Sequence, residues 1–145
     1  MWRRAALILL FPCVLWAEKP SFDGLFPSGV VRGATNAVTL FGKFDPWPPK
    51  VWTSGEGLDF LFETNKGKVQ LTVATEAAPG PRLLRLYNDD GTSEVQFLVI
   101  EAGSQELEKE PNDHFRKPQF LTNFPATVSG RLEKNEDVDS FAIEL

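Results

Sequence analysis

Apolar and polar side chains alternate along much of residues 20–102, and this pattern decides which folds are open to the chain. Val69, Leu71 and Val73 alternate with Gln70 and Thr72, and similar runs recur between turn residues. A period of two places the apolar side chains on one face of a β-strand, and no long stretch has a convincing helical period. The sequence therefore predicts an all-β sandwich with strands at Ser21–Leu25, Ala37–Phe44, Lys50–Thr53, Leu58–Glu63, Lys68–Ala74, Arg82–Tyr87 and Glu94–Ile100.

Turn residues separate these runs. Asn88-Asp89-Asp90-Gly91 lies between two of them and predicts a hairpin, because Asn, Asp and Gly tolerate positive φ. Pro79-Gly80-Pro81 ends one segment and begins the next. Pro27-Ser28-Gly29 and Arg32-Gly33 interrupt the approach to Ala37, so no strand is expected between Leu25 and Ala37.

The first seventeen residues have the layout of an export signal. The basic start Met1-Trp2-Arg3-Arg4 precedes an apolar stretch from Ala5 to Phe11, and Leu15-Trp16-Ala17 forms an imperfect cleavage site. The apolar run is interrupted by Pro12 and is too short for a comfortable membrane span. We therefore expect a cleaved signal peptide at 1–17, rather than a retained short anchor, and a secreted, periplasmic or cell-surface protein. Cleavage also removes Cys13, the single cysteine, so disulfides do not contribute.

The chain is acidic. Its 15 Lys and Arg residues against 20 Asp and Glu residues give a net charge of −5, and removal of Arg3 and Arg4 leaves 13 against 20, or −7. Nucleic-acid binding needs clustered Lys and Arg against phosphate, so this composition argues against a nucleic-acid partner. An acidic surface is compatible with cation binding, although acidity alone usually serves solubility.

Two acidic segments near the end of the chain provide a candidate metal site. In residues 108–112 three oxygen-bearing side chains occupy alternate positions, so in an extended chain they leave from the same side. Residues 136–141 repeat the arrangement with two aspartates. Calcium takes about six to eight hard oxygen ligands in flexible geometry. If the two segments lie side by side, the sequence predicts a structural Ca²⁺ site; otherwise they are a solvated linker and turn. The candidate ligands are Glu108, Glu110, Asn112, Asp113, Asp137 and Asp139.

The same residues carry a family resemblance. The chain resembles the opening of a bacterial pre-peptidase C-terminal (PPC) domain in three motifs, an acidic E-P-N start, a V-x-G-x-L strand and a D-x-D-x-F strand. The matching residues are Glu108-x-Glu110-Pro111-Asn112-Asp113, Val128-Ser129-Gly130-Arg131-Leu132 and Asp137-Val138-Asp139-Ser140-Phe141. This resemblance implies a β-sandwich module attached to exported proteases or other exported proteins. Related collagen-binding modules hold calcium with the corresponding acidic residues, which implies the same six ligands here.

The amino-terminal part resembles an IPT/TIG-type immunoglobulin-like domain. The similar residues are Pro20-Ser21-Phe22-x-x-Leu25-Phe26-Pro27-x-Gly29, Arg32-Gly33-Ala34-Thr35, Val38-Thr39-Leu40-x-Gly42, Pro79-Gly80-Pro81-Arg82-Leu83-Leu84-Arg85-Leu86 and Gly91-Thr92-Ser93-Glu94-x-x-Phe97. The resemblance implies an immunoglobulin-like β-sandwich of the kind that usually serves as a spacer or adhesive module. It indicates a fold better than a function.

These observations divide the chain into an immunoglobulin-like domain at 18–101, a linker at 102–109 and the amino-terminal part of a PPC-like domain at 110–145. The linker is polar and charged, which favours a solvated hinge, although its residues also suit a helix. We expect cation binding to extend and fix this hinge. Strands are expected at Thr127–Leu132 and Ser140–Leu145, with the odd-numbered face of the second continuing into a core. Because the sequence stops at Leu145, before the remaining strands of such a sandwich, we expect a partial (truncated) module.

No catalytic constellation is recognisable. The mature chain lacks a cysteine nucleophile, and His114 is the only histidine, which argues against a His-rich zinc site and an H-E-x-x-H motif. Trp47 and Trp52, in a proline-rich segment, can stack on a sugar ring or receive a protein partner, or they can cap the sandwich core.

The sequence thus predicts an exported, non-enzymatic binding or spacer module. We expect it to be the amino-terminal part of a larger secreted or cell-surface protein associated with a peptidase. One alternative is an adhesive module that binds polysaccharide or protein through Trp47 and Trp52. Another is the leading segment of a secreted hydrolase whose catalytic domain lies beyond the chain end.

Overall fold

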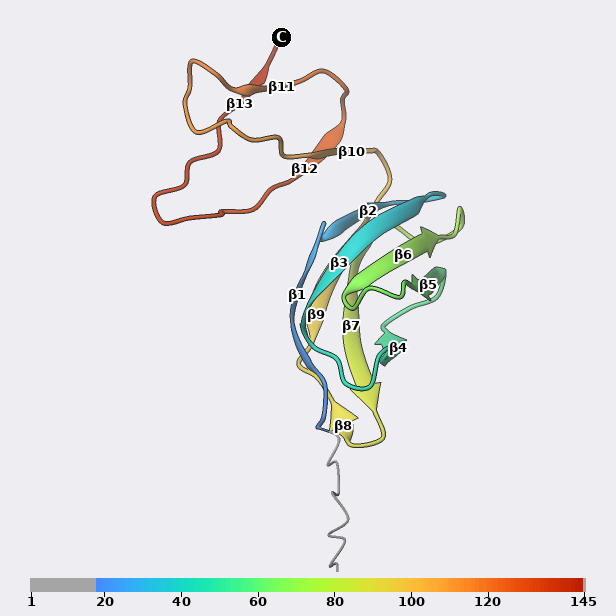
Figure 1. Cartoon of the computed structure of the whole chain (residues 1–145). Helices are drawn as coiled ribbons and strands as arrows, with labels where there is room; N and C mark the ends of the chain where they lie inside the picture. The colour runs from blue at the N-terminus through green and yellow to red at the C-terminus, as the bar shows by residue number, and fades with distance from the viewer. Residues whose placement is uncertain (1–17, 145) are drawn as a thin grey trace, which may run out of the picture.

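The structure, a computed structural model, describes residues 18–144, and the signal peptide expected at 1–17 lies outside the described residues. Within residues 18–144 every regular element is a β-strand (Figure 1), which confirms the all-β prediction. No helix in this part of the chain is long and apolar enough to cross a membrane. The strands are β1 (Ser21–Phe26), β2 (Gly29–Val31), β3 (Thr35–Lys43), β4 (Lys50–Thr53), β5 (Leu58–Phe62), β6 (Lys68–Val73), β7 (Gly80–Asn88), β8 (Gly91–Thr92), β9 (Gln96–Glu101), β10 (Ser104–Leu107), β11 (Gln119–Leu121), β12 (Ala126–Ser129) and β13 (Phe141–Ile143).

The first nine strands form an immunoglobulin-like sandwich of two sheets. One sheet has the order β1-β3-β6-β5, and the other has the order β2-β9-β7-β4 with β8 beside β7 (Figure 1). Thirteen buried apolar residues fill the space between the sheets, and each large one contributes about 1.5–3 kcal/mol by leaving water. They are Phe22, Val30, Val38, Leu40, Phe44, Val69, Leu71, Val73, Ala77, Leu84, Leu86, Leu98 and Ile100.

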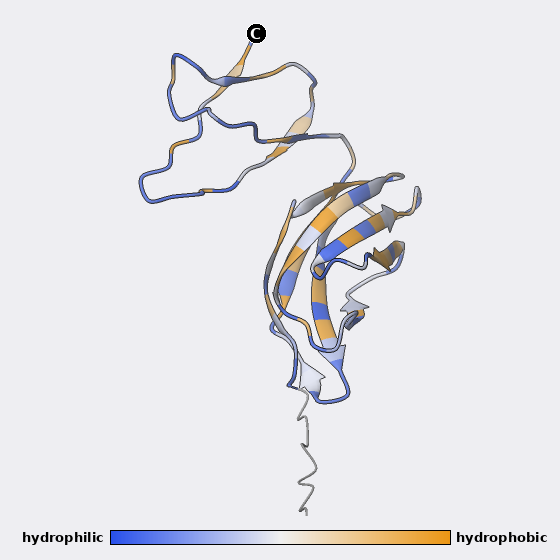
Figure 2. Cartoon of the chain, viewed as in Figure 1, coloured by the Kyte–Doolittle hydropathy of each residue, from blue (hydrophilic) through white to orange (hydrophobic). Residues whose placement is uncertain are grey.

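Period-two alternation produces this core. In β6 the side chains of Val69, Leu71 and Val73 are buried, while Lys68 and Thr72 are exposed. Figure 2 shows the same alternation of hydrophobic and hydrophilic residues along β3, β6 and β7. The hairpin prediction is also confirmed, because β7 pairs with β8 and the Asn88 Oδ1 atom accepts hydrogen bonds from the backbone N–H groups of Asp90 and Gly91 (2.9 and 3.1 Å).

Strand β2 corrects the expectation that no strand lies between Leu25 and Ala37. It pairs in parallel with β9 and places Val30 in the core. The Asn36 side chain accepts a hydrogen bond from the Val31 backbone N–H (2.9 Å) and donates one to the Val31 carbonyl (3.2 Å). The Asn36 side chain thus makes hydrogen bonds to the backbone of β2, and these bonds help a strand to form between two turn-forming segments.

Residues 102–144 form a smaller, open module at one end of the sandwich (Figure 1). Strand β10 pairs in parallel with β12, and β11 pairs in parallel with β13. Residues 104–107, which were expected to belong to a solvated hinge, are therefore strand β10, because their backbone groups find partners in β12. This module completes the predicted architecture of a sandwich followed by a partial one.

The expectation that the odd-numbered face of β13 is buried is wrong. Phe141 and Ile143 are 38% and 51% exposed. Within the described residues β11 and β13 form a two-stranded sheet, and no further sheet covers that face. An apolar face is buried only where a second layer packs on it.

Candidate metal centre

Backbone hydrogen bonds bring the two acidic segments together. The Ser140 N–H donates to the Asn112 carbonyl (3.0 Å), and the Glu108 N–H donates to the Ser129 carbonyl (3.0 Å). Strand β11 follows the first acidic segment in sequence and β13 follows the second, and the two strands pair in parallel. The geometric condition for a shared site is therefore met.

The carboxylates form two overlapping groups. Oxygens of Glu108, Glu110 and Asp139 all lie within 4.8 Å of one another, and so do oxygens of Glu110, Asp113 and Asp137. Calcium–oxygen distances are about 2.3–2.6 Å, so two ligands of one ion are at most about 5 Å apart. Each group thus has the spacing of a set of calcium ligands, and Glu110 belongs to both.

Asn112, the one amide among the predicted ligands, bonds to two of the carboxylates and is 1% exposed. Its Nδ2 atom donates to Glu108 Oε1 (3.2 Å), and its backbone N–H donates to Glu110 Oε2 (2.9 Å). Its Oδ1 atom is buried and has no hydrogen-bond partner.

Unpartnered buried oxygens concentrate in this cluster. Four buried side-chain polar atoms of the described residues lack a partner, and three are the Oδ1 atoms of Asn112, Asp137 and Asp139. An unsatisfied buried polar group costs about 1–3 kcal/mol. All three atoms are acceptors, so a cation could bind the oxygens that receive no hydrogen bond from the protein.

The cluster contains two neighbouring carboxyl groups, Asp139 and Glu108, whose charges repel each other. A hydrogen bond with Glu108, together with burial, raises the pKa of Asp139 to about 6. The Arg131 backbone N–H donates to Glu108 Oε2 (2.7 Å) and holds the pKa of Glu108 below its usual range. Without a cation, Asp139 therefore keeps a proton far more readily than an ordinary aspartate, because two adjacent carboxylates repel.

Lys134 supplies a positive charge at the other side of the cluster. Its Nζ atom lies 3.0 Å from Asp113 Oδ1 and 3.6 Å from Asp137 Oδ1. The hydrogen bond to Asp113 raises the pKa of Lys134, and the Glu133 backbone N–H, bonded to Asp137 Oδ2 (2.5 Å), is the main cause of the lowered pKa of Asp137. The cluster thus contains five carboxyl groups and one ammonium group, so its oxygen acceptors outnumber its cationic donors.

Sequence reasoning missed Arg131, Glu133 and Lys134. Arg131 and Glu133 act through backbone N–H groups, which no residue type reveals. Gly130 lies next to Glu108, and a Cβ atom at this position would lie 3.0 Å from Glu108 Oε2. A larger residue here would therefore require the carboxylate to shift slightly.

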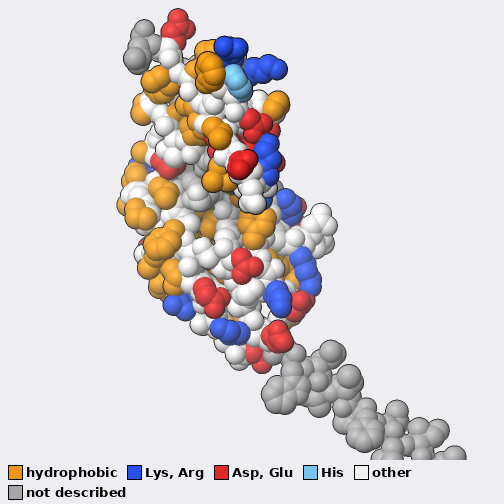
Figure 3. Space-filling view, turned by 90° about the vertical axis from the view of Figure 1, so that its left-hand side faces the viewer, with side chains coloured by type: hydrophobic (Ala, Val, Ile, Leu, Met, Phe, Trp, Pro, Cys, Tyr) orange, Lys and Arg blue, Asp and Glu red, His pale blue; other side chains and the backbone are white. Residues whose placement is uncertain are grey.

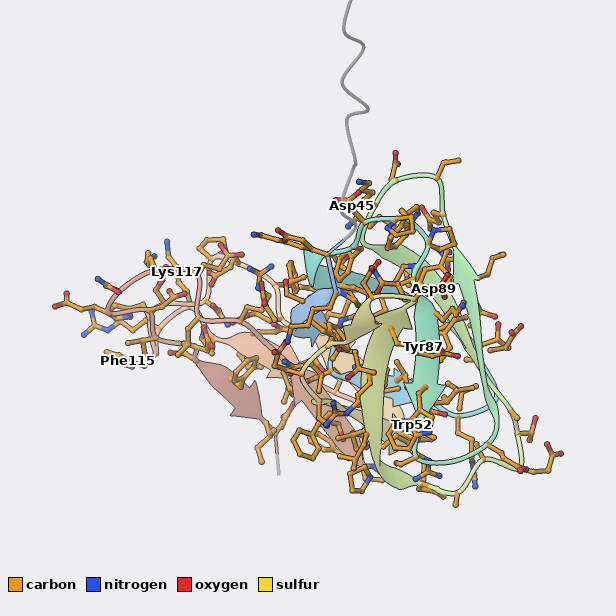
Figure 4. All side chains as sticks on the ribbon, turned by 90° about the horizontal axis from the view of Figure 1, so that it is seen from below. Asp45, Trp52, Tyr87, Asp89, Phe115 and Lys117 are labelled. Atoms are coloured by element: carbon orange, nitrogen blue, oxygen red, sulfur yellow. The ribbon has the colours of Figure 1, made fainter. Side chains whose placement is uncertain are left out.

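The two candidate partner-binding tryptophans lie in different environments. Trp47 packs against the core between Phe44 and Phe62, with ring centroids 5.7 and 5.2 Å away, and its Nε1–H donates to the Glu63 carbonyl (2.8 Å). Trp52, labelled in Figure 4, is 48% exposed on β4. Trp47 thus contributes to the sandwich, and Trp52 is available to a partner.

No protein-family model matches this sequence, and no curated protein sequence matches it. Among solved structures the chain is similar to a chimeric titin Z1Z2 carrying a decorin peptide (22% identity, 59% of this chain and 96% of that one, TM-score 0.35). It is also similar to a titin M10–obscurin-like 1 Ig complex (20% identity, 59% and 95%, TM-score 0.38). The twitchin kinase region of C. elegans is a third (19% identity, 57% and 16%, TM-score 0.39). Similarity at this level says nothing about what this chain binds.

Proposed function

We propose that residues 102–144 hold a structural calcium site and that the chain is an exported, non-catalytic binding or spacer module. The ion is bound by carboxylate oxygens from both acidic segments and by the Asn112 amide oxygen. It links the start of the module to the segment before β13. The proposed ligands are Glu108, Glu110, Asn112, Asp113, Asp137 and Asp139.

One observation carries this proposal: three buried acceptor oxygens without hydrogen-bond partners, on Asn112, Asp137 and Asp139, lie in one cluster of carboxylates, and only that of Asp137 has a charge partner, Lys134 at 3.6 Å. Structural ion pairs would leave donors and acceptors matched. Here acceptors are in excess, and a hard divalent cation with oxygen ligands is the chemical complement. Because Glu110 belongs to both carboxylate groups, it can bridge two ions, and the binding stoichiometry distinguishes one ion from two.

The wider role rests on the sequence resemblances. An IPT/TIG-type domain followed by a PPC-type module fits a spacer within a larger secreted or cell-surface protein associated with a peptidase. The export signal at 1–17 belongs to the same proposal. A leading segment of a secreted hydrolase is the alternative, and the presence or absence of a hydrolase domain in the sequence encoded after Leu145 separates the two.

Calorimetric titration of residues 18–145 with Ca²⁺ tests the site. We expect binding by the wild type, and affinity at least about tenfold lower for Asp139→Asn, because the substitution removes a charged ligand. Asp59→Asn is the matched control, since Asp59 is exposed on β5 and outside the cluster. If addition of calcium produces neither heat of binding nor a shift in melting temperature, the calcium site is contradicted and only the scaffold role remains.

A second candidate function is adhesion through the outer face of the β2-β9-β7-β4 sheet. Trp52 on β4 and Phe97 on β9 are 48% and 62% exposed and lie on either side of β7. Large exposed aromatic side chains on one sheet face suit a sugar ring or a protein surface. Pull-down with glycans or matrix proteins, compared between wild type and Trp52→Ala, tests this function; equal retention contradicts it.

A further inference from the structure

A short basic and aromatic loop directly follows the candidate metal centre. The loop, residues 113–118, joins the acidic segment to β11 and contains His114, Phe115, Arg116 and Lys117 in succession. It is compact, because the Lys117 N–H donates to the His114 carbonyl (2.7 Å) and the Arg116 N–H donates to His114 Nδ1 (3.0 Å). We call it the basic loop.

Phe115 is presented to solvent by its neighbours. Its side chain is 72% exposed. The His114 ring stacks on it at a centroid distance of 4.6 Å, and the Arg116 guanidinium lies 5.3 Å from the ring centre. The loop therefore displays an apolar ring beside the cationic side chains of Arg116 and Lys117, which is a combination that favours the boundary between water and an anionic lipid layer.

The basic loop lies at a free end of the molecule. Figure 4 shows Phe115 and Lys117 at the end of the open module that points away from the sandwich. Figure 3 shows, at one end of the molecule, Lys and Arg side chains and the pale-blue histidine colour next to hydrophobic side chains. A flat surface can approach this end without meeting the sandwich.

Charge explains why such contact would need a cation. The chain carries a net charge of −5, and the loop begins at Asp113, within the acidic cluster. Five carboxyl groups next to the loop repel anionic headgroups. A bound calcium ion would offset two of these negative charges and so weaken that repulsion.

We propose that the basic loop attaches the protein to anionic phospholipid surfaces in a calcium-dependent manner, an inference that rests on the proposed calcium site. Phe115 enters the headgroup region, while Arg116 and Lys117 contact lipid phosphates. A soluble phosphate would use the cations alone and leave the exposed ring in water. The aromatic side chain therefore favours a lipid layer as the partner.

Vesicle sedimentation with residues 18–145 tests this inference. We expect at least about tenfold more protein on vesicles of phosphatidylcholine with phosphatidylglycerol in calcium than in chelator, and little on phosphatidylcholine alone. Phe115→Ala lowers the bound fraction about tenfold, because an inserted aromatic ring is lost. Leu61→Ala is the matched control, since Leu61 is similarly exposed (66%) but lies on β5 of the sandwich, and it binds as the wild type does.

Calorimetry without vesicles separates the two proposals. Phe115→Ala should bind calcium as the wild type does, because its side chain is not a ligand. Calcium binding in solution without adsorption to anionic vesicles overturns the membrane inference and leaves the calcium site standing. Adsorption that is equal in chelator, or equal for Phe115→Ala, also overturns it, and absence of calcium binding overturns both. Inhibition by free inorganic phosphate at millimolar concentration would identify a soluble anion as the partner and contradict the lipid assignment.

Discussion

At the residue scale, Asp139 is the residue of the candidate centre whose ionisation is most strongly opposed, because it lies next to the Glu108 carboxylate. Its hydrogen bond with Glu108 requires a proton between two carboxyl groups when no cation is present. A divalent ion replaces that proton and satisfies both groups at once. Calcium and protons therefore compete for the same oxygens.

The metal-free open module should lose stability as the pH rises from about 4 to about 6. The folded-state pKa of Asp139, about 6, lies above its ordinary value of 3.8, so its stabilising contribution is complete below about pH 4 and is lost as the pH rises through 6. The lowered pKa values of Glu108 and Asp137 act in the opposite direction, so the net loss should be clearest above about pH 5, where carboxyl groups of ordinary pKa are largely ionised in the unfolded chain as well.

Backbone amide exchange of Arg131 and Ser140, corrected for the intrinsic effect of pH, measures this loss. Protection should fall with rising pH in calcium-free buffer, stay constant in Asp139→Asn, and reverse its trend in saturating calcium. Protection that increases with pH without calcium would show that Asp139 does not share a proton with Glu108.

The acidic residues of the candidate centre could be singled out because the alternation of oxygen-bearing side chains is visible in residues 108–112. Their partners were not. Arg131 contributes a backbone N–H to Glu108, and Lys134 reaches Asp113 over 21 positions of sequence. Such contacts depend on the path of the chain rather than on local pattern.

At the element scale, Arg131 connects the open module to the sandwich. Its backbone bonds Glu108, and its guanidinium lies 5.7 Å from the ring centre of Phe26 and 5.2 Å from that of Phe41. Gln105 on β10 adds a second link, because its Nε2 atom donates to the Gly29 carbonyl (2.5 Å).

Arg131→Ala should therefore loosen the two parts without unfolding either. An exposed cation–π contact is worth about 0.5–1 kcal/mol, and two such contacts are lost. Residual dipolar couplings should fit one alignment tensor in the wild type and two in the variant. Arg32→Ala, an exposed arginine outside these contacts, serves as control. A single tensor in Arg131→Ala would mean that Gln105 and β10 suffice.

Strands could be predicted where apolar and polar residues alternate clearly. They were missed where a strand is held by a side-chain hydrogen bond or by a distant partner strand. The seven strands expected in the sandwich all occur, with ends that differ by a few residues. Strand β2 was missed because Asn36 holds its edge, and β10 was missed because its partner β12 follows about twenty residues later. Polar segments such as Ser104–Leu107 become strands only when a distant partner is present.

At the scale of the whole molecule, stability is distributed unevenly. All thirteen buried apolar core residues of the described chain lie at or before Ile100. The open module relies on two two-stranded sheets, and isolated pairs of strands are marginal in water. The sequence indicated this contrast through the density of apolar alternation, but not the exposure of Phe141 and Ile143.

A fragment of residues 18–101 should therefore fold alone, with a melting temperature that calcium does not change. Residues 102–144 alone should be unfolded in chelator. Circular dichroism melts of both fragments with and without calcium measure this. A calcium-dependent melting temperature of the first fragment would place an ion in the sandwich instead.

The central claim is that one cation joins two acidic segments, and anomalous diffraction from crystals grown in calcium tests it most directly. The expected result is an anomalous peak about 2.3–2.6 Å from Asn112 Oδ1 and from carboxylate oxygens of Glu110 and Asp139. A peak bound by one segment only, or ordered water there at saturating calcium, would contradict the account.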